Sequence, residues 1–287
     1  MKSLAEFKEK TFEKYFGFEL AQLTNISFSP DQCDEAFLGF DDAFFIPLEL
    51  LWHRLPRMRR SRRLRLFGMD LRDLDFIAEE LGRRLPPFKF NLFVQYKRPE
   101  YVDHHRGKEW PCWNGAYYRY DTTPHQQTIL EKLETQSSGR ASTVYATAAF
   151  WENKTLYDLS LSRGVIDHTN IASVGRLKGH HRFTYQFEGC TGKGHSQAES
   201  IETPKFSQII ADGLNQEALP FNRHIKRCAR QIEDVLKEDD ATMTLIGAAR
   251  RNLLRYEETS TPDSFSYALA TISVFREIFD TSFYAVG

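Results

Sequence analysis

The segment Phe88–Tyr96, FKFNLFVQY, is the strongest strand candidate in the chain and limits the folds that the chain can adopt. Aromatic and apolar side chains alternate with others along it, and Pro99 closes it. The period of two places its apolar side chains on one face, and a set that ends in Gln95 and Lys97 on the other. A chain organised around such a strand contains a sheet and is not all-helical.

The order of the other elements predicts the fold class. Over the first ~150 residues, helical and strand-like patterns alternate, which indicates an α/β (α+β) domain with a central sheet. The expected helices are 5–23, 67–81 and 124–135, and the expected strands are 36–46, 88–96, 116–120 and 141–150. Residues 151–203 are polar and Gly-rich, with two further strands expected near Ser173 and Phe183. We expect one α/β domain over residues 1–203.

The pattern changes beyond Pro204. Helical periodicity predicts three helices, at roughly 205–238, 241–257 and 262–280, with an acidic turn and Pro262 separating them. Residues 204–287 are therefore expected to form a helical C-terminal region.

Composition indicates a folded protein outside the membrane. Hydrophobic residues make up 41% and charged residues 27% of the 287 positions, which excludes a mainly disordered chain. The first residues carry charge throughout, no apolar run reaches the ~18 residues of a membrane span, and the mean hydropathy is −0.50. The four cysteines are widely spaced without a CxxC pair, which argues against a disulfide scaffold and a zinc site. We expect a cytoplasmic protein with reduced thiols.

The net charge of −1 hides a concentrated basic segment. Seven arginines lie within twelve residues: Arg54, Arg57, Arg59, Arg60, Arg62, Arg63 and Arg65. Arginine makes bidentate phosphate contacts, so the six arginines from Arg57 onward are candidate nucleic-acid-binding residues. The alternative is internal neutralisation by the acid-rich helix that follows, from Asp70 to Glu80, or by a partner subunit.

Two pairs of polar residues interrupt apolar strands. Aspartate is depleted in strands, yet Asp41 and Asp42 follow Phe40, and a buried carboxylate needs a cation or a hydrogen-bond donor. Gln95 and Lys97 project side by side, about 7 Å apart. An oxygen ligand for a metal with an ammonium beside it suits phosphodiester hydrolysis. The alternative for each pair is a solvated sheet edge.

These residues resemble a known family. Gly39-Phe40-Asp41 on one strand and Gln95-Tyr96-Lys97 on another, preceded by a Glu-bearing helix, are similar to the PD-(D/E)xK nuclease superfamily, in particular its Mrr-like QxK variant. The resemblance covers roughly residues 5–150. It implies a central mixed sheet flanked by helices, as in restriction endonucleases. It also implies cleavage of DNA rather than RNA, dependent on Mg²⁺ or Mn²⁺, in a prokaryotic restriction or anti-phage defence system.

The resemblance also assigns roles to individual residues. Asp41 would be the metal carboxylate and Gln95 the second ligand, and the backbone carbonyl of Tyr96 would complete the coordination. Lys97 would be the catalytic lysine. Glu19, or else Glu13, would correspond to the auxiliary acid that some members carry.

A second interpretation follows from the departures from the family pattern. The 54 positions between Asp41 and Gln95 exceed the usual spacing, and Gln95 is neutral where most members have an acid. The chain would then be a non-catalytic, partner-binding subunit of a defence complex, or a homo-oligomer, built on a degenerate nuclease fold.

The remaining motifs favour structural uses. Cys190 and His195 match no zinc-finger spacing, and the Gly-rich loop 189–195 lacks the phosphate-binding GxxxxGK[ST] arrangement. The aromatic cluster between Trp110 and Tyr120 could stack on bases, although packing beneath a loop is the favoured interpretation.

Overall fold

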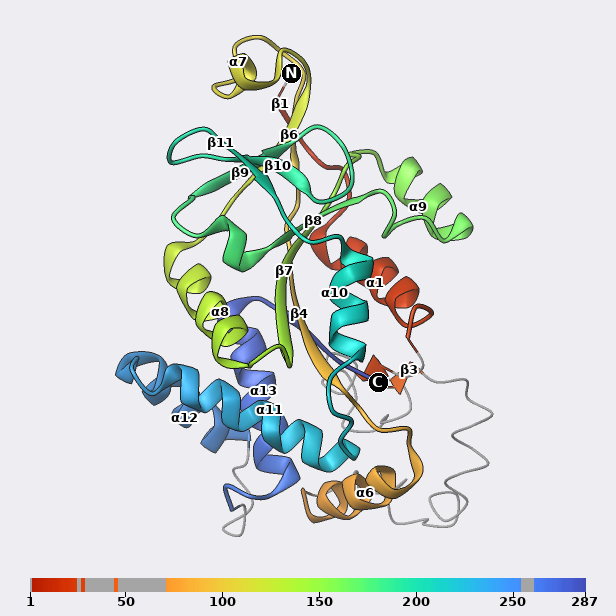
Figure 1. Ribbon diagram of the computed structural model, residues 1–287, viewed down its shortest axis with the longest axis vertical. Helices are drawn as coiled ribbons and strands as arrows, with labels where there is room; N and C mark the ends of the chain where they lie inside the picture. The colour runs from red at the N-terminus through yellow and green to blue at the C-terminus, as the bar shows by residue number, and fades with distance from the viewer. Residues whose placement is uncertain (1, 25–26, 29–43, 46–70, 254–260) are drawn as a thin grey trace. The chain divides into compact units, whose positions relative to one another are not determined.

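The protein is an α+β structure, as the sequence predicts, but it has two sheets where one central sheet was expected (Figure 1). The computed structural model describes residues 2–24, 27–28, 44–45, 71–253 and 261–287. Within these ranges, the chain divides into two compact units. Unit 1 comprises 1–23, 94–135 and 142–212, and unit 2 comprises 24–93, 136–141 and 213–287. The chain passes between the units at five places, two of which lie inside strands. A domain boundary between residues 203 and 204 stays a prediction.

The elements of unit 1 include a sheet that is antiparallel at each recorded pairing. Its strand order is β1-β5-β6-β9-β10-β11. The strands are β1 (Lys2–Leu4), β5 (Glu100–Val102), β6 (Tyr117–Asp121), β9 (Arg182–Tyr185), β10 (Thr191–Gly194) and β11 (Glu199–Glu202). The helices are α1 (Glu9–Leu20), α7 (Trp110–Trp113), α8 (Pro124–Gln136), α9 (Asn153–Ser162), the 3₁₀ turn η2 (Val174–Leu177) and α10 (Phe206–Leu214).

The second sheet has the strand order β3-β2-β12-β4-β7-β8. Its strands are β2 (Ser27–Phe28), β3 (Phe44–Phe45), β4 (Phe90–Tyr96), β7 (Ala141–Ala148), β8 (Thr169–Ser173) and β12 (Ser282–Val286). The amide of Asn91 donates to Arg140 O at 2.8 Å, and that of Lys97 to Ala146 O at 3.0 Å. Both donor and acceptor advance by six residues, so β4 and β7 run parallel, whereas β7 and β8 are antiparallel. The sheet is therefore mixed.

Helices cover both faces of β4 and β7 within unit 1 (Figure 1). On one face, Phe12 and Phe16 of α1 meet the ring of Tyr96 at 5.9 and 5.4 Å between centroids. On the other face, the Tyr145 hydroxyl of β7 donates to Gln127 Oε1 of α8 at 2.5 Å. Since neighbouring residues of a strand point to opposite faces, Gln95 and Lys97 lie on the face opposite to Tyr96.

Unit 2 has a core of aromatic side chains between helices and the start of β4. Its helices are α6 (Leu71–Arg84), α11 (Phe221–Leu236), α12 (Asp240–Leu253) and α13 (Phe265–Phe279). Phe93 packs against Phe275 and Phe283, with centroids 5.7 and 5.1 Å apart. Phe221 packs against Phe265 at 5.3 Å, which holds α11 to α13.

One predicted helix is wrong, and several short elements were not foreseen: the strands β1, β2, β5, β10, β11 and β12 and the helices α7 and α9. The continuous helix over 205–238 is two helices, α10 and α11, because Pro220 precedes α11 and the backbone of Leu219 pairs with Phe88 instead of continuing a helix. Strand β12 follows α13 and pairs with β2. In the described part of the chain, no helix is both long and apolar enough to cross a bilayer.

The buried His224 of α11 predicts a loss of stability in acid. Burial, followed by the charges of Arg140 and Arg227, lowers the pKa of His224 to about 4, and its Nε2 hydrogen bonds with Asn91 Oδ1 at 2.8 Å. In the unfolded chain His224 is protonated below pH ~6.5, whereas in the folded chain it is protonated only below pH ~4. The free energy of unfolding therefore falls by about 3 kcal/mol as the pH is lowered across this window. Urea unfolding of the wild type and of His224→Gln at pH 7 and 4.5 measures this loss of stability. Parallel pH profiles of the two proteins would contradict the assignment.

Candidate functional site

Gln95 of β4 is a buried amide without a hydrogen-bond partner in the described part of the chain. Its side chain is 1% exposed, and neither Oε1 nor Nε2 has a hydrogen-bond partner among the described residues. A buried amide normally finds such partners, and leaving one unsatisfied costs about 1–3 kcal/mol. Gln95 is therefore an unusual residue in its strand, and its oxygen is the kind that a hard divalent cation accepts as a ligand.

Lys97 lies two residues further along the same face of β4. Its side chain is half-buried, and Nζ stands 6.0 Å from the centroid of the Tyr145 ring, near enough for a cation–π contact. The structure therefore brings Gln95 and Lys97 to the α8 side of the sheet, as the alternation predicts.

Tyr96 and Glu19 lie on the α1 side of this strand. The carboxylate of Glu19 accepts the backbone amides of Val165 and Ile166 at 2.8 and 2.9 Å and is 8% exposed. Both carboxylate oxygens of Glu19 therefore accept hydrogen bonds from the segment that follows α9, and this gives Glu19 a structural role. The structure does not bring Glu19 together with Gln95 and Lys97. The side chain of Glu13 forms an ion pair with Lys10 at 2.9 Å.

The other predicted site residues lie outside the described residues. These are the metal carboxylate Asp41 and the arginine segment, with Arg57, Arg59, Arg60, Arg62, Arg63 and Arg65. Their roles stay predictions. In the described ranges, no three His, Cys, Asp or Glu side chains cluster as a metal site would require. Of the predicted metal ligands that lie in the described ranges, Gln95 fits Mg²⁺ or Mn²⁺ through a side-chain oxygen without a described partner, and the carboxylate would have to come from Asp41.

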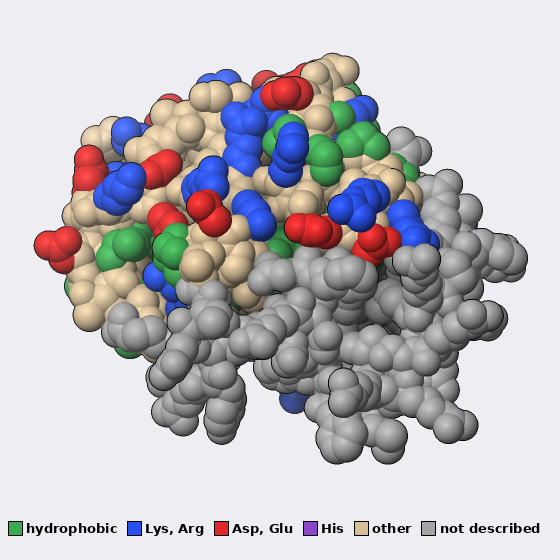
Figure 2. All heavy atoms as spheres, turned by 90° about the horizontal axis from the view of Figure 1, so that it is seen from below, with side chains coloured by type: hydrophobic (Ala, Val, Ile, Leu, Met, Phe, Trp, Pro, Cys, Tyr) green, Lys and Arg blue, Asp and Glu red, His purple; other side chains and the backbone are tan. Residues whose placement is uncertain are grey.

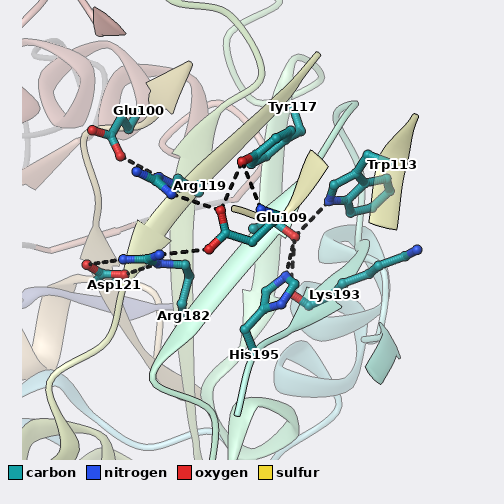
Figure 3. Close-up of polar contacts among 10 residues, drawn as sticks. Glu100, Glu109, Trp113, Tyr117, Arg119, Asp121, Arg182, Lys193 and His195 are labelled. Carbon is teal, nitrogen blue, oxygen red and sulfur yellow. Dashed lines mark hydrogen bonds and ion pairs between the residues drawn. The ribbon is translucent and has the colours of Figure 1, made fainter. Parts of the chain in front are cut away.

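A second polar cluster lies on the antiparallel sheet of unit 1, around the buried acid Glu109 (Figure 3). Glu109 is 4% exposed. Its Oε2 accepts from the Tyr117 hydroxyl at 2.9 Å and from Arg119 Nη1 at 2.8 Å, and its Oε1 accepts from Arg182 Nη1 at 2.7 Å. The two guanidinium groups have further carboxylate partners, since Arg119 binds Glu100 and Arg182 binds Asp121. We call these six residues the Glu109 network.

The charges of the network reinforce one another. Burial by itself would raise the pKa of Glu109, but hydrogen bonds from Arg182, Tyr117 and Arg119 outweigh it and lower the pKa to about 2. Burial and the hydrogen bond to Glu109 raise the pKa of Tyr117 to about 12. Glu109 therefore stays ionised and Tyr117 stays neutral across the physiological range, so neither is suited to exchange protons there.

A hydroxyl beside the network fixes the tryptophan loop. Thr184 Oγ1 accepts from Trp113 Nε1 at 2.9 Å and lies 2.8 Å from His195 Nε2 (Figure 3). The same hydroxyl donates to Lys193 O at 3.4 Å, and its contact with His195 is compatible with either tautomer of a neutral imidazole. Burial lowers the pKa of His195, in agreement with that neutral form. Lys193 donates to Cys112 O at 2.5 Å and stands 4.7 Å from the Trp113 ring centroid.

These contacts assign the Glu109 network a structural role that the sequence did not indicate. Tyr117, Arg119 and Asp121 share one face of β6, but the other three members come from β5, β9 and a loop, so no local spacing joins all six. The aromatic cluster of the same region divides between two uses. The rings of Tyr117, Tyr118 and Tyr120 are buried, whereas Trp110 and Trp113 are half-exposed.

No protein family, no curated protein and no solved structure matches this chain. The geometry of its own residues therefore carries the functional argument.

Proposed function

We propose that the chain is a metal-dependent nuclease that binds DNA and hydrolyses its phosphodiester bonds at Asp41, Gln95 and Lys97. The proposal includes a restriction-endonuclease-like arrangement of the sheet and a setting in cytoplasmic prokaryotic defence, both taken from the resemblance. One observation carries it. The amide of Gln95 is buried, has no hydrogen-bond partner among the described residues, and lies beside a lysine on the same face of a strand.

An unsatisfied amide favours a ligand-binding role over a packing role. An apolar side chain of the same size would fill the position without the free-energy cost of an unpaired polar group. The cost is offset when a ligand binds the oxygen. Mg²⁺, when bound, polarises the phosphoryl oxygen and lowers the pKa of a coordinated water.

Lys97 supplies the positive charge that such a site needs beside the metal ligand. Its partial burial strengthens electrostatic interactions with the negative charge that develops on the phosphoryl oxygens as water attacks. Gln95 supplies an oxygen ligand, and Asp41 supplies the carboxylate that a hard cation prefers.

Cleavage assays on the full chain test the proposal. Plasmid and linear DNA are incubated with the protein in Mg²⁺, in Mn²⁺ and in EDTA, and an RNA of the same sequence is included. We expect metal-dependent DNA cleavage, and a fall of about 100-fold or more in rate for Asp41→Asn and for Lys97→Met. Lys89→Met is the matched control, since Lys89 is a half-buried lysine next to the same strand. It should cleave like the wild type.

Two results would overturn the proposal. Cleavage that persists in both the Asp41 and the Lys97 variants would remove this site from the reaction. Failure to cleave DNA in either metal, with a partner protein retained on purification from the native host, would favour the non-catalytic subunit.

A further inference from the structure

Helix α11 of unit 2 carries basic side chains along its exposed face. Arg223, Arg227 and Arg230 are exposed and Lys226 is half-buried, at positions i, i+4, i+7 and i+3. The opposite face buries apolar residues such as Ile225, Cys228 and Ile232 in the core. We call the four cations the basic face of α11. Figure 2 shows many Lys and Arg side chains, with Asp and Glu side chains among them, on the described part of the surface seen from below.

This placement of cations works against helix stability. The N-terminal end of a helix carries a partial positive charge and favours acidic residues, but α11 has none in its first turn, and its first acid is Glu233. Cations three and four residues apart also repel one another. These four cations thus lower the stability of α11 locally. The packing of the helix does not require them, so their presence favours a binding role for the surface.

Acidic neighbours compensate for only part of the basic face. Arg230 pairs with Asp263 at 2.5 Å, and Arg227 is 3.9 Å from Glu217, which binds Arg140 more closely at 2.7 Å. Arg223 and Lys226 have no acidic partner in the described part of the chain. The positive field of Arg140 and Arg227 also reaches the interior, since both contribute to the lowered pKa of His224.

The chemistry of the face fits phosphate groups. Three of the four cations are arginines, whose planar guanidinium binds phosphate bidentately. Arg223 and Arg230 are seven residues apart and therefore about 10 Å apart along the helix. A DNA strand carries a phosphate every ~3.4 Å along its axis, so the row can contact about three phosphates. The apolar face of α11 is buried, so the helix has no apolar side available to insert into a membrane.

We propose that the basic face of α11 binds the phosphate backbone of double-stranded DNA. The choice of DNA rests on the proposed function, but the contact requires no catalysis.

Salt-dependent binding tests the inference. Affinity for a fluorescent 25-bp duplex, in a buffer with EDTA to prevent cleavage, is measured between ~50 and ~200 mM salt for the wild type and for Arg223→Gln/Lys226→Gln/Arg227→Gln. We expect the variant to bind at least about tenfold more weakly at low salt, and its slope of log K against log salt to fall by about 2 to 3. Its melting temperature should be unchanged or higher, because repulsion on the helix is relieved.

A charge-matched variant separates this surface from general electrostatics. Arg176→Gln/Lys178→Gln/Lys205→Gln removes three exposed cations from unit 1 and should leave the slope within about one unit of the wild type. The inference would be overturned if the slope of log K against log salt fell equally in both variants, or if it did not fall in the α11 variant. So would binding of the wild type to vesicles rich in phosphatidylserine, or to an acidic protein, without binding to the duplex.

The outcomes distinguish this inference from the proposed function. DNA binding that weakens in the α11 variant while neither protein cleaves DNA supports the basic face and refutes catalysis. Cleavage and affinity that both stay normal in the α11 variant refute the basic face and leave the nuclease proposal standing.

Discussion

Replacing Glu109 by alanine is expected to lower the free energy of unfolding by about 3–5 kcal/mol. The carboxylate neutralises two guanidinium groups whose side chains are only 12% and 21% exposed, those of Arg119 and Arg182. Without it, Arg119 keeps one carboxylate and Arg182 keeps the more exposed Asp121, and the Tyr117 hydroxyl loses its acceptor. Urea unfolding followed by circular dichroism at pH 7 measures the loss.

Two variants control for this effect. Glu109→Gln keeps the volume and an acceptor oxygen but removes the charge, so its loss should be smaller than that of Glu109→Ala. Asp121→Asn changes an acid that is 63% exposed and should cost no more than about 1 kcal/mol. A loss below about 1 kcal/mol for Glu109→Ala would show that the network is not a unit. Because the folded pKa of about 2 lies below the ordinary value, the contribution of Glu109 is complete above pH ~4.5 and disappears as the pH falls towards 2.

Replacing Gln95 by leucine is expected to raise the free energy of unfolding by about 1–3 kcal/mol and to abolish metal-dependent cleavage. The amide is 1% exposed and has no described partner, so an apolar side chain of similar size removes a desolvation cost from the folded state. The same change deletes the oxygen that the proposed metal would use. Stability by urea unfolding and cleavage in Mg²⁺ are measured on one preparation.

Asn91 provides the matched control for this prediction. It is a buried amide on the same strand and the same face, but its Oδ1 is bonded to His224. Asn91→Leu should therefore destabilise the protein by about 1–3 kcal/mol, opposite in sign to Gln95→Leu. If Gln95→Leu destabilises as Asn91→Leu does, Gln95 has a structural role and the site loses its main support.

Local patterns predicted the elements with a clear period but missed several short ones. The expected strand 88–96 is β4 over Phe90–Tyr96, since an alternating aromatic segment closed by proline has few other options. The expected helix 124–135 is α8 over Pro124–Gln136, with proline at its first position. The expected helix 67–81 is described from Leu71 to Arg84 as α6.

Long-range contacts account for what sequence patterns missed. The helical periodicity over 205–238 corresponds to two helices, α10 and α11. The break between them depends on the pairing of the Leu219 backbone with Phe88, which is far away in the sequence. The Glu109 network likewise forms only when β6 and β9 pair and set Asp121 opposite Arg182. In the candidate site, the alternation of side chains along β4 predicted that Gln95 and Lys97 share one face. It could not reveal that the amide of Gln95 has no hydrogen-bond partner among the described residues.

The pairing of β12 with β2 has a consequence for how the chain is made. Val286 lies opposite Ser27, so these strands are more than 250 residues apart in the sequence. Its other neighbour, β3, is close in sequence, but on the ribosome β2 must wait for almost all of the rest of the chain before β12 is made, and the closure of so long a loop slows folding. A fragment that stops after residue 203 would lack α11, α13 and β12. Such a fragment should leave β2 without β12 and the start of β4 without the helices that pack on it, and it should aggregate during expression.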